Sequence, residues 1–436
     1  MSAFEPFGFP MSASRYLSVI GFLPGILTAS IAAAGTWSGL KGNSGRGVST
    51  ETKLPTMWST TENLAWQVDL PSRGASSPAV TSDRIYVTSQ TEDESLWVVS
   101  IDRRSGDIIW EKNIGKGTLV GYGPPNMFRP RHNAATPSPS ADENHVWAFF
   151  GTGHLVCLSK AGEVVWDHDM TEEYGAFDIK FGMTSSPRLW GDLLYLACMH
   201  KGPSYVVAFD KKTGKEKWFA DRTFRANADG TDAYSSPVVL ESDDGDQLVV
   251  VGADHVNAYD LLSGDQIWVS AGLKVRSEYG RLNASPAIGD GVIVCASHGE
   301  STIAVRTGGT GDVTKSHRLW NGPNNMADCP TPTCRRGIVY VPRDDGTARA
   351  FDAMTGKRHW QKRLKGKVYR ASPVVADGKV YMLSKEGICT VIQEGTKYKV
   401  LAENELPGEF FATPAISDGF IFLRANDRLY AVGPSK

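Results

Sequence analysis

The chain lacks a strong net charge of either sign. Its 46 lysine and arginine residues nearly balance 48 aspartate and glutamate residues, which leaves a formal net charge of −2. Proteins that bind nucleic acid usually carry an excess of basic residues, so this balance gives no electrostatic case for a nucleic-acid partner. Cysteine is also scarce, with six in 436 residues, and this number excludes a disulfide-dense scaffold.

The cysteines fall into two groups. Four lie in apolar, strand-like runs, where buried free thiols are expected; these are Cys157, Cys198, Cys295 and Cys389. The other two, Cys329 and Cys334, flank the segment 330–333 and could instead close a small disulfide loop in an oxidising compartment.

Long hydrophobic runs are confined to the N-terminus. Arg15 precedes an apolar run over residues 16–31, and three alanines follow at 32–34. This order predicts a signal peptide over residues 1–34 with cleavage before Gly35, and translation from Met11 would also give the usual proportions. An uncleaved anchor or a buried helix are the alternatives. No other run is long enough to span a bilayer, so the mature chain is predicted to be periplasmic or secreted, without a membrane span.

The sequence is rich in glycine, proline and tryptophan (45, 23 and 12 residues), which favours many short strands and tight turns. One pattern recurs: an aspartate, then Ser/Thr-Gly, then a tryptophan eight residues after the aspartate. The four full copies are Asp102 to Trp110, Asp210 to Trp218, Asp260 to Trp268 and Asp352 to Trp360. We interpret each copy as a β-hairpin in which the aspartate caps the turn, the glycine takes a positive φ and the tryptophan fills a gap between packed sheets.

A second marker is a Ser/Thr-Pro step at the start of an apolar run. It occurs at Ser77, Thr136, Ser186, Ser236, Ser285, Thr331, Ser372 and Thr413, with proline-to-proline intervals of 59, 50, 50, 49, 46, 41 and 41 residues. This period is typical of four-stranded propeller blades. Proline is tolerated at a strand entry because its missing N–H is not needed in the ladder there.

The two ends of the chain complement each other. The last unit begins at Thr413, and the chain ends at Lys436 before a fourth strand can form, whereas residues 63–70 contain a strand around Trp66 without the three strands that should precede it. Pairing the two would close the ring and remove an open sheet edge. The sequence therefore predicts an all-β, eight-bladed β-propeller of four-stranded antiparallel blades over residues 63–436, preceded by a strap at 35–62 and expected to be a monomer.

One glycine-rich segment departs from the repeat. The run Gly308-Gly309-Thr310-Gly311 could be mistaken for a phosphate-binding loop, but no strand–loop–helix unit surrounds it. A long hairpin turn is the better interpretation.

With the Asp-x-x-[Ser/Thr]-Gly-x-x-x-Trp copies and the eight Ser/Thr-Pro steps in place, the chain resembles the pyrroloquinoline-quinone-type β-propeller superfamily over residues 60–433. The strap from Trp37 to Ser49 is similar to the opening of compact exported members, which are often grouped with BamB of the outer-membrane assembly machinery. The resemblance implies a propeller fold but leaves the function open, because propellers host both enzymes and scaffolds.

Three functions follow from the resemblance. Quinone-dependent alcohol or sugar dehydrogenases of the family use a catalytic Asp, a calcium ion, an Arg near the quinone and, in several, a disulfide between adjacent cysteines. Here no two cysteines are adjacent, no Cys-x-x-Cys-His haem site is present, and no catalytic residue or metal ligand can be assigned. The preferred hypothesis is therefore a non-catalytic scaffold for an exported protein or an envelope component, without cofactor; a dehydrogenase with quinone and calcium and a carbohydrate-binding propeller are the alternatives.

Candidate binding residues precede the Ser/Thr-Pro steps, because each connection from an outer strand to the next inner strand delivers its last residues to one mouth of the channel. These residues are Arg73, His132, Asn133, Lys180, Tyr234, Arg281, Asn283, Arg370 and Phe411. They would form a basic, partly aromatic rim suited to an anionic group, a sugar or an acidic partner segment. Alternatively, the cations are solvated or pair with Asp178, Asp232, Glu278 and Glu409.

The longest interval between markers contains a loop at residues 121–133, which makes it the best candidate for a functional loop. Its Tyr122, Phe128 and Arg131 could contact a partner or pack over the blade edge. His132 is the histidine expected in the mouth, but one histidine forms neither a metal site nor a base by itself.

Overall fold

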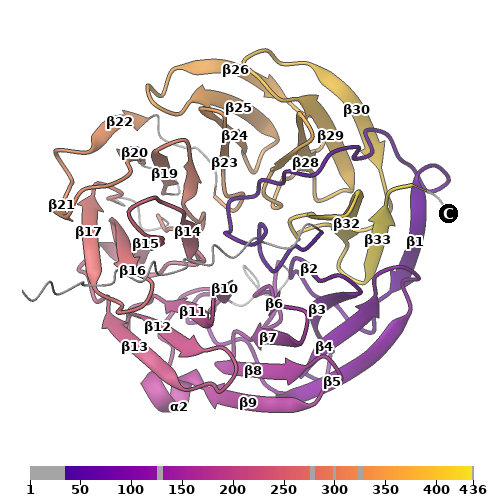
Figure 1. Ribbon diagram of the computed structural model, residues 1–436, viewed down its shortest axis with the longest axis horizontal. Coiled ribbons are helices and arrows are strands. Elements are labelled where there is room, and N and C mark those ends of the chain that lie inside the picture. Colours follow the sequence, from indigo (N-terminus) through magenta and orange to yellow (C-terminus); the bar gives the residue numbers. More distant parts are fainter. Residues whose placement is uncertain (1–34, 125–130, 275–279, 298–300, 323–327, 435–436) are drawn as a thin grey trace, which may run out of the picture. The chain divides into compact units, whose positions relative to one another are not determined.

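The computed structural model describes residues 35–124, 131–274, 280–297, 301–322 and 328–434. Within these ranges the strands form eight sheets, arranged in a ring around a central channel (Figure 1). The predicted eight-bladed propeller is therefore confirmed. The predicted signal peptide, residues 1–34, lies outside the described residues. Helix in the described ranges is limited to α2 (Met170–Tyr174) and the 3-10 turn η1 (Ala228–Thr231).

Each blade is a meander that runs from the channel outward, and the first four blades follow chain order. Blade 1 contains β2 (Ala79–Val80), β3 (Arg84–Gln90), β4 (Ser95–Asp102) and β5 (Ile108–Lys116); blade 2 contains β6 (Ser140–Ala141), β7 (His145–Phe149), β8 (His154–Ser159) and β9 (Val164–Asp169); blade 3 contains β10 (Arg188–Trp190), β11 (Leu193–Cys198), β12 (Tyr205–Asp210) and β13 (Glu216–Asp221); blade 4 contains β14 (Val238–Leu240), β15 (Gln247–Gly252), β16 (His255–Asp260) and β17 (Gln266–Ala271).

The remaining blades repeat this order, with one added strand and one strand taken from the N-terminal side. Blade 5 contains β18 (Ala287–Gly289), β19 (Val292–Ala296), β20 (Thr302–Arg306) and β22 (Arg318–Gly322), while β21 (Gly311–Asp312) joins blade 4; blade 6 contains β23 (Thr333–Arg335), β24 (Ile338–Pro342), β25 (Thr347–Asp352) and β26 (Arg358–Arg363); blade 7 contains β27 (Val374–Ala376), β28 (Lys379–Leu383), β29 (Ile388–Gln393) and β30 (Val400–Glu405); blade 8 contains β31 (Ala415–Ser417), β32 (Phe420–Arg424), β33 (Arg428–Val432) and β1 (Leu64–Asp69).

The ring closes as the sequence predicts. Strand β1 pairs antiparallel with β33, with Trp66 opposite Ala431 and Asp69 opposite Arg428. The outer strand of the last blade therefore comes from the N-terminal side of the chain, and it covers β33, which would otherwise be an open sheet edge.

The repeated aspartate shapes its hairpin as expected. Oδ1 of Asp260 accepts hydrogen bonds from the backbone N–H groups of Leu262 and Ser263, each at 2.8 Å, and Gly264 has a φ of 77°. A β-bulge follows, because Ala258 lies opposite Trp268 whereas Tyr259 lies opposite Gln266. The same one-residue shift recurs between the two outermost strands of every blade. It sets the tryptophan position in seven blades, and in blade 7 Ala402 takes this place.

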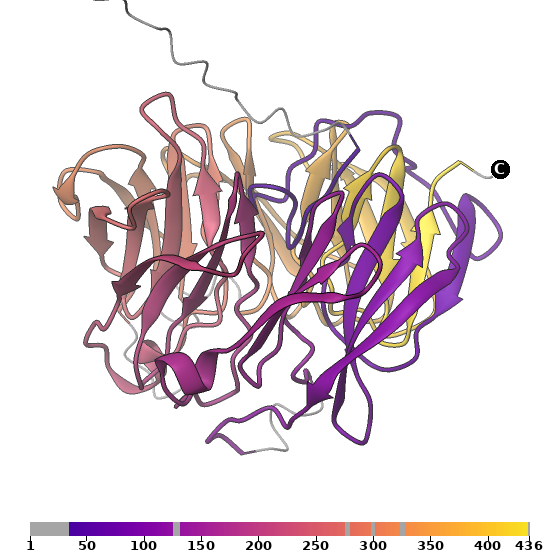
Figure 2. The same cartoon turned by 60° about the horizontal axis from the view of Figure 1, so that its bottom comes forward.

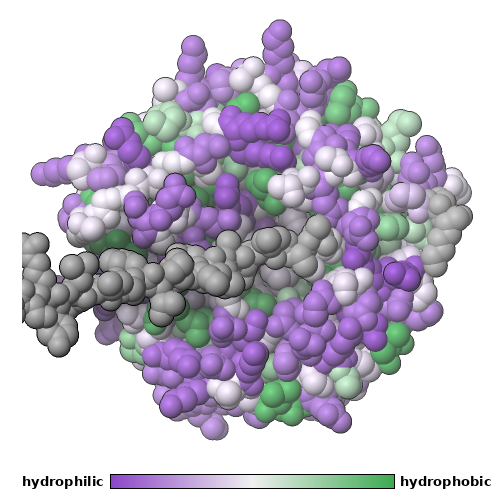
Figure 3. Space-filling view, viewed as in Figure 1, coloured by the Kyte–Doolittle hydropathy of each residue, from purple (hydrophilic) through white to green (hydrophobic). Residues whose placement is uncertain are grey.

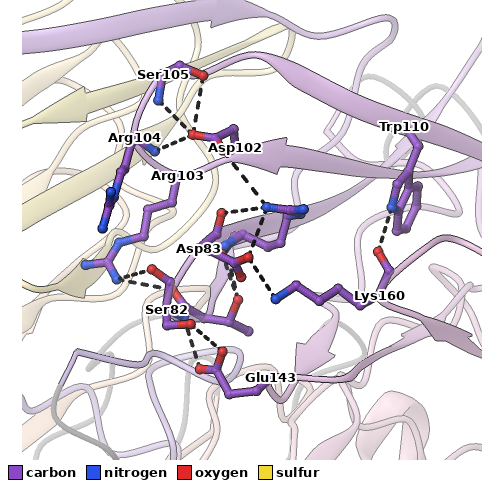
Figure 4. A network of polar contacts seen from close by, with 11 residues as sticks. Ser82, Asp83, Asp102, Arg103, Arg104, Ser105, Trp110, Glu143 and Lys160 are labelled. Carbon is purple, nitrogen blue, oxygen red and sulfur yellow. Dashed lines mark hydrogen bonds and ion pairs between the residues drawn. The ribbon is translucent and has the colours of Figure 1, made fainter.

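Most of the blade tryptophans dock onto the next blade. Each indole Nε1 donates a hydrogen bond to the backbone carbonyl of the residue after the turn aspartate, or after its counterpart Ser159 in blade 2, as Figure 4 shows for Trp110 and Lys160. The pairs are Trp66 to Arg103 at 3.1 Å, Trp110 to Lys160 at 2.9 Å, Trp166 to Lys211 at 3.0 Å, Trp218 to Leu261 at 2.9 Å and Trp320 to Ala353 at 2.8 Å. The predicted docking role is confirmed at these interfaces.

Two of the predicted docking residues behave differently. Nε1 of Trp268 donates to Oε1 of Gln247 in its own blade at 3.0 Å, because the glycine-rich segment after β20 sends β21 back along β17 and places Gly311 beside Trp268. This segment is the predicted long hairpin turn. Nε1 of Trp360 has no hydrogen-bond partner in the described part of the chain, and its ring meets the edge of Tyr398 at 5.1 Å.

The residue after the turn aspartate, or after Ser159 in blade 2, also forms ion pairs across three interfaces. Lys160 Nζ lies 2.7 Å from Asp83 (Figure 4), Lys211 Nζ lies 3.2 Å from Asp142, and Arg103 lies 3.4 Å from Asp418. Leu261 and Ala353 occupy this position in blades 4 and 6, where only the carbonyl contact persists. The backbone thus supplies the repeated contact, and the side chain adds a local one.

The strap crosses one end of the channel and bonds to the ends of the inner strands. Trp37 exchanges two backbone hydrogen bonds with Val80, each at 2.8 Å, while Ser44 and Gly47 accept from the N–H groups of Val239 and Val375. Figure 2 shows the indigo strap at the end of the ring opposite the loop that follows β5. The face viewed in Figure 3 is mostly hydrophilic, with hydrophobic residues only scattered over its visible part.

Candidate functional site

A belt of eight hydroxyl side chains lines the channel. Each accepts a hydrogen bond from the backbone N–H of its counterpart in the preceding blade, at 2.8 to 3.1 Å, and Thr413 closes the circle by donating its N–H to Ser77. The members are Ser77, Ser138, Ser186, Ser236, Ser285, Thr331, Ser372 and Thr413, all buried. Because each oxygen accepts this bond, its own proton is left to donate elsewhere.

The belt corrects one of the eight predicted markers. In blade 2 the belt residue is Ser138, followed by Pro139, rather than Thr136. The connection after β5 is the longest, so the chain reaches the channel one dipeptide later. Thr136 instead ends that connection, where its Oγ1 accepts from the N–H of Asn133 at 3.2 Å. Two adjacent Ser/Thr-Pro steps could not be told apart by spacing alone.

The strap forms the closed end of the channel. Leu40 lines the cavity, and the next residue, Lys41, is buried with its Nζ donating to the carbonyl of Pro332 at 2.7 Å. Arg188 is buried beside it and donates to the carbonyls of Leu40, Gly42, Asn43 and Pro237. Burial lowers the pKa of Arg188 to about 10, and burial with the nearby Arg188 charge lowers the pKa of Lys41 well below its usual value.

Most of the predicted rim residues meet at the opposite end, around a cavity of about 260 Å³. The lining includes Arg131, His132, Tyr234, Arg281, Asn283, Arg370 and Phe411 from the predicted set. Arg73 and Asn133 line a neighbouring pocket of about 520 Å³ that shares Arg131 and His132. Tyr122 and Lys180 line neither space, and Phe128 lies outside the described residues.

The arginines of the mouth are largely paired, and of the carboxylates considered from the sequence Glu409 is one that is used, by Arg73. Arg281 Nη2 lies 2.6 Å from Asp328, and Arg370 pairs with Asp344. Arg73 contacts Glu409 at 3.9 Å, but both groups are more than half exposed, so this pair contributes little. Glu278 lies outside the described residues.

Asp328 and Asp344 hold the mouth connections together. Asp344 accepts the backbone N–H of Asp328 at 2.6 Å and that of Cys329 at 3.3 Å, and Asn283 donates its amide to Asp328. The carboxylates therefore fix the connection between blades 5 and 6. Sequence reasoning missed both. Asp328 stands three residues before Thr331-Pro332, so the rule used for the other mouth residues could have found it, whereas Asp344 lies in the hairpin between β24 and β25 and precedes no such step.

Two titratable groups of the mouth, His132 and Cys329, are held neutral. Burial and the adjacent Arg131 charge lower the pKa of His132 to about 4, so its imidazole is neutral at pH 7. Burial raises the pKa of the Cys329 thiol to about 12. All six cysteines are free thiols, so the disulfide considered for Cys329 and Cys334 is not formed: β23 carries Cys334 into the core, whereas Cys329 stays at the mouth beside Arg370.

The start of the predicted functional loop packs on the connections of neighbouring blades. Tyr122 donates its backbone N–H to Ile179 at 3.2 Å and its hydroxyl to the buried Asp232 at 3.1 Å. Lys201 Nζ lies 5.4 Å from the centre of the Tyr122 ring, and about half of the Tyr122 surface is exposed. This segment therefore forms part of the mouth face rather than a free arm.

The donor set at the mouth does not fit calcium. Carboxylate oxygens of Asp328 and Asp344 and the sulfur of Cys329 lie within 4.8 Å of one another. Calcium takes six to eight oxygen ligands, but here both carboxylates are engaged by arginine and N–H donors and the third group is a protonated thiol. Phe181, which could stack on a planar cofactor, already has the Arg281 guanidinium 5.2 Å from its ring centre.

Comparison with known proteins shows what this arrangement resembles. The chain is similar in structure to BamB from Moraxella catarrhalis (TM-score 0.58, 12% identity, covering 85% of this chain and 99% of that one) and to a europium-containing methanol dehydrogenase (TM-score 0.65, 13% identity, 90% of each chain). It is also similar to the computationally designed protein Ika8 (TM-score 0.58, 11% identity, 85% and 99%). A designed protein scores as well as BamB, so these likenesses show the fold alone.

Sequence comparison is more specific. A search of curated protein sequences returned no match. The profile of the family described as outer membrane protein assembly factor BamB matches residues 94–362, 311–397 and 345–433, which together span most of the chain. No helix in the described part of the chain combines the length and apolar character needed to cross a bilayer. On the strength of the profile match, the chain belongs to the outer membrane protein assembly factor BamB family.

Proposed function

We propose that the chain is an exported, non-catalytic scaffold that binds a protein of the cell envelope at the mouth of its channel. The observation that carries this proposal is the use of the ionisable groups around the cavity. Asp328 and Asp344 are occupied in ion pairs and backbone contacts, and His132 and Cys329 are held neutral. A nucleophile would need the Cys329 thiolate, and a metal site would need carboxylates that are not already paired. A general base at pH 7 would need a pKa near 7, whereas that of His132 is about 4.

The exposed side chains around the mouth suit binding of another protein. Arg131 is exposed at the edge of the cavity, and Tyr122 and Val120 are about half exposed on the same face. Partly exposed aromatic and arginine side chains are enriched where proteins bind one another. Family membership supports an envelope partner, and a dehydrogenase or a glycan-binding propeller is the competing interpretation.

Affinity capture tests the proposal. Purified mature chain would be used as bait in envelope extracts, alongside the double variant Arg131→Glu with Phe411→Ala and the control Arg104→Glu, which alters an exposed arginine on a blade turn at the strap end. We expect a protein retained by the wild type and the control and lost by the double variant. Retention of the same proteins by all three would exclude the mouth as the binding site.

A further inference from the structure

The cavity at the mouth carries an excess of positive charge. Three arginines, Arg131, Arg281 and Arg370, line it, against a single carboxylate, that of Asp328. Arg281 and Arg370 are held by Asp328 and Asp344, which fixes their guanidinium planes but does not neutralise the third arginine. No ion pair of Arg131 is found among the described residues, and its side chain is exposed.

The closed end adds to this charge. Arg188 donates to the carbonyl of Leu40, which lines the cavity, and its other hydrogen bonds in the described structure also go to carbonyl oxygens rather than to carboxylates. Charges buried in a low-dielectric wall act over a longer range than exposed ones, because solvent screens them less. The belt of eight hydroxyls contributes further donors between floor and mouth.

Aromatic rings lie next to the cations. Phe181 and Tyr234 have ring centres 6.3 Å apart on one side, and Phe411 lines the cavity with Lys385 Nζ 5.4 Å from its ring centre. Such walls offer apolar contact beside a positive group. At about 260 Å³ the cavity is smaller than the roughly 300–1,000 Å³ of pockets that bury a drug-sized ligand. It is of a size for one or two side chains.

We propose that the mouth cavity receives a partner segment that carries an acidic side chain next to an aromatic one, with the carboxylate meeting Arg131 and the hydroxyl belt and the ring packing on Phe411. This inference rests on the proposed scaffold function and specifies the chemistry of the partner. Charge-assisted hydrogen bonds to arginine fix the position of the carboxylate, and the aromatic ring supplies buried apolar area.

Two capped peptides test it directly. Acetyl-Gly-Glu-Phe-Gly-amide and acetyl-Gly-Gln-Phe-Gly-amide differ only in the acidic group, and both lack terminal charges. Titration calorimetry with the mature chain should show the Glu peptide binding at least about tenfold more tightly, as expected for one hydrogen bond to a charged group. The preference should shrink at high salt and be lost in Arg131→Gln, while Arg104→Gln, on the strap side, should leave it unchanged.

The peptide titrations have outcomes that would contradict the inference. Equal affinity for the two peptides, no binding of either, or an unchanged preference in Arg131→Gln would overturn the inference. Circular dichroism of the variant checks that it is folded, and because Arg131 is exposed we expect no loss of structure. If affinity capture still retains a mouth-dependent protein while the peptides do not discriminate, the scaffold function stands and only the acidic segment is wrong.

Discussion

The indole of Trp218 in blade 3 donates a hydrogen bond to the carbonyl of Leu261 in blade 4, at 2.9 Å. The same ring lies against Gly264, where an added Cβ would fall 2.5 Å from the indole. Two parts of the repeat, the tryptophan and the glycine, therefore act on each other across the blade interface rather than within one hairpin. Their spacing in sequence is set by the interface that they build together.

Replacing Trp218 with Phe should destabilise the fold. The change removes the indole N–H and part of the ring, and it leaves the Leu261 carbonyl with the Tyr195 hydroxyl, at 3.1 Å, as its donor. We expect a cost of about 1–2 kcal/mol. The matched control is Trp360→Phe, because the Trp360 indole has no hydrogen-bond partner in the described part of the chain. Denaturant unfolding should give a larger loss for the Trp218 variant; equal losses would mean that the hydrogen bond adds nothing.

Replacing Gly264 with Ala should cost more than the same change at a turn without a facing ring. Gly264 has a φ of 77° and meets Trp218, whereas Gly378 has a φ of 67° and nothing lies within 4 Å of its added Cβ. Both variants incur the left-handed backbone penalty of about 1–2 kcal/mol. Only Gly264→Ala must also displace a tryptophan. Unfolding midpoints measured under identical conditions should separate the two, and equal shifts would contradict the tight fit.

Lys41 should make the free energy of unfolding depend on pH in the alkaline range. Its pKa in the folded chain lies well below the ordinary 10.5, chiefly because of burial. As pH falls below 10.5, the unfolded chain takes up a proton that the folded chain resists, so the folded state is disfavoured; raising the pH toward 10.5 removes this penalty. The wild type should therefore gain stability relative to Lys41→Met between pH 7 and about 10.

The comparison uses the difference between the two proteins at each pH, which cancels the titration of other groups. Lys357→Met, at an exposed position on the surface, serves as the control and should run parallel to the wild type. A constant difference between wild type and Lys41→Met across this range would show that Lys41 stays charged in the folded chain.

The fold could be predicted from the sequence because its signals repeat. Asp260, Gly264 and Trp268 recur at fixed offsets, and each offset reflects a local constraint: a capped turn, a positive φ and a bulge. The belt residue of blade 2 shows the limit of this reasoning, because the sequence predicted Thr136 and the structure has Ser138 in that place. Two markers two residues apart satisfy the same local pattern, and only the hydrogen bond to the next blade selects one.

The site could be predicted only in outline. Position before a Ser/Thr-Pro step correctly brought Arg281, Asn283 and Arg370 to one cavity. Of their partners, Asp328 stands three residues before Thr331-Pro332 and satisfies the same pattern, although it was not named, whereas Asp344 lies in the hairpin between β24 and β25, which no such pattern marks. The sequence also did not predict the residues at the closed end of the channel. Arg188 and Lys41 are 147 residues apart in the chain, and their burial depends on where the strap crosses the ring.

The cysteines should be unreactive in the folded chain. Burial is the main cause that raises the pKa of each of the six thiols to about 12, so almost no thiolate exists at pH 8. A thiol-specific chromogenic reagent should therefore label none in native protein and all six after unfolding without reductant. Only four labelled thiols in the unfolded, unreduced chain would instead reveal a disulfide, for which Cys329 and Cys334 are the candidates.

Pyrroloquinoline quinone and calcium should not assemble at the mouth. Both carboxylates that a calcium ion would need are held by Arg281 and Arg370, so binding would require breaking two ion pairs without a gain of comparable ligands. We expect gel filtration after incubation with both to yield protein without quinone absorbance and without dye reduction by alcohols or sugars. The variant Arg281→Gln with Arg370→Gln releases the carboxylates, and calcium should then bind more tightly by calorimetry than to the wild type. Stoichiometric quinone on the wild-type chain would contradict this account and favour the dehydrogenase.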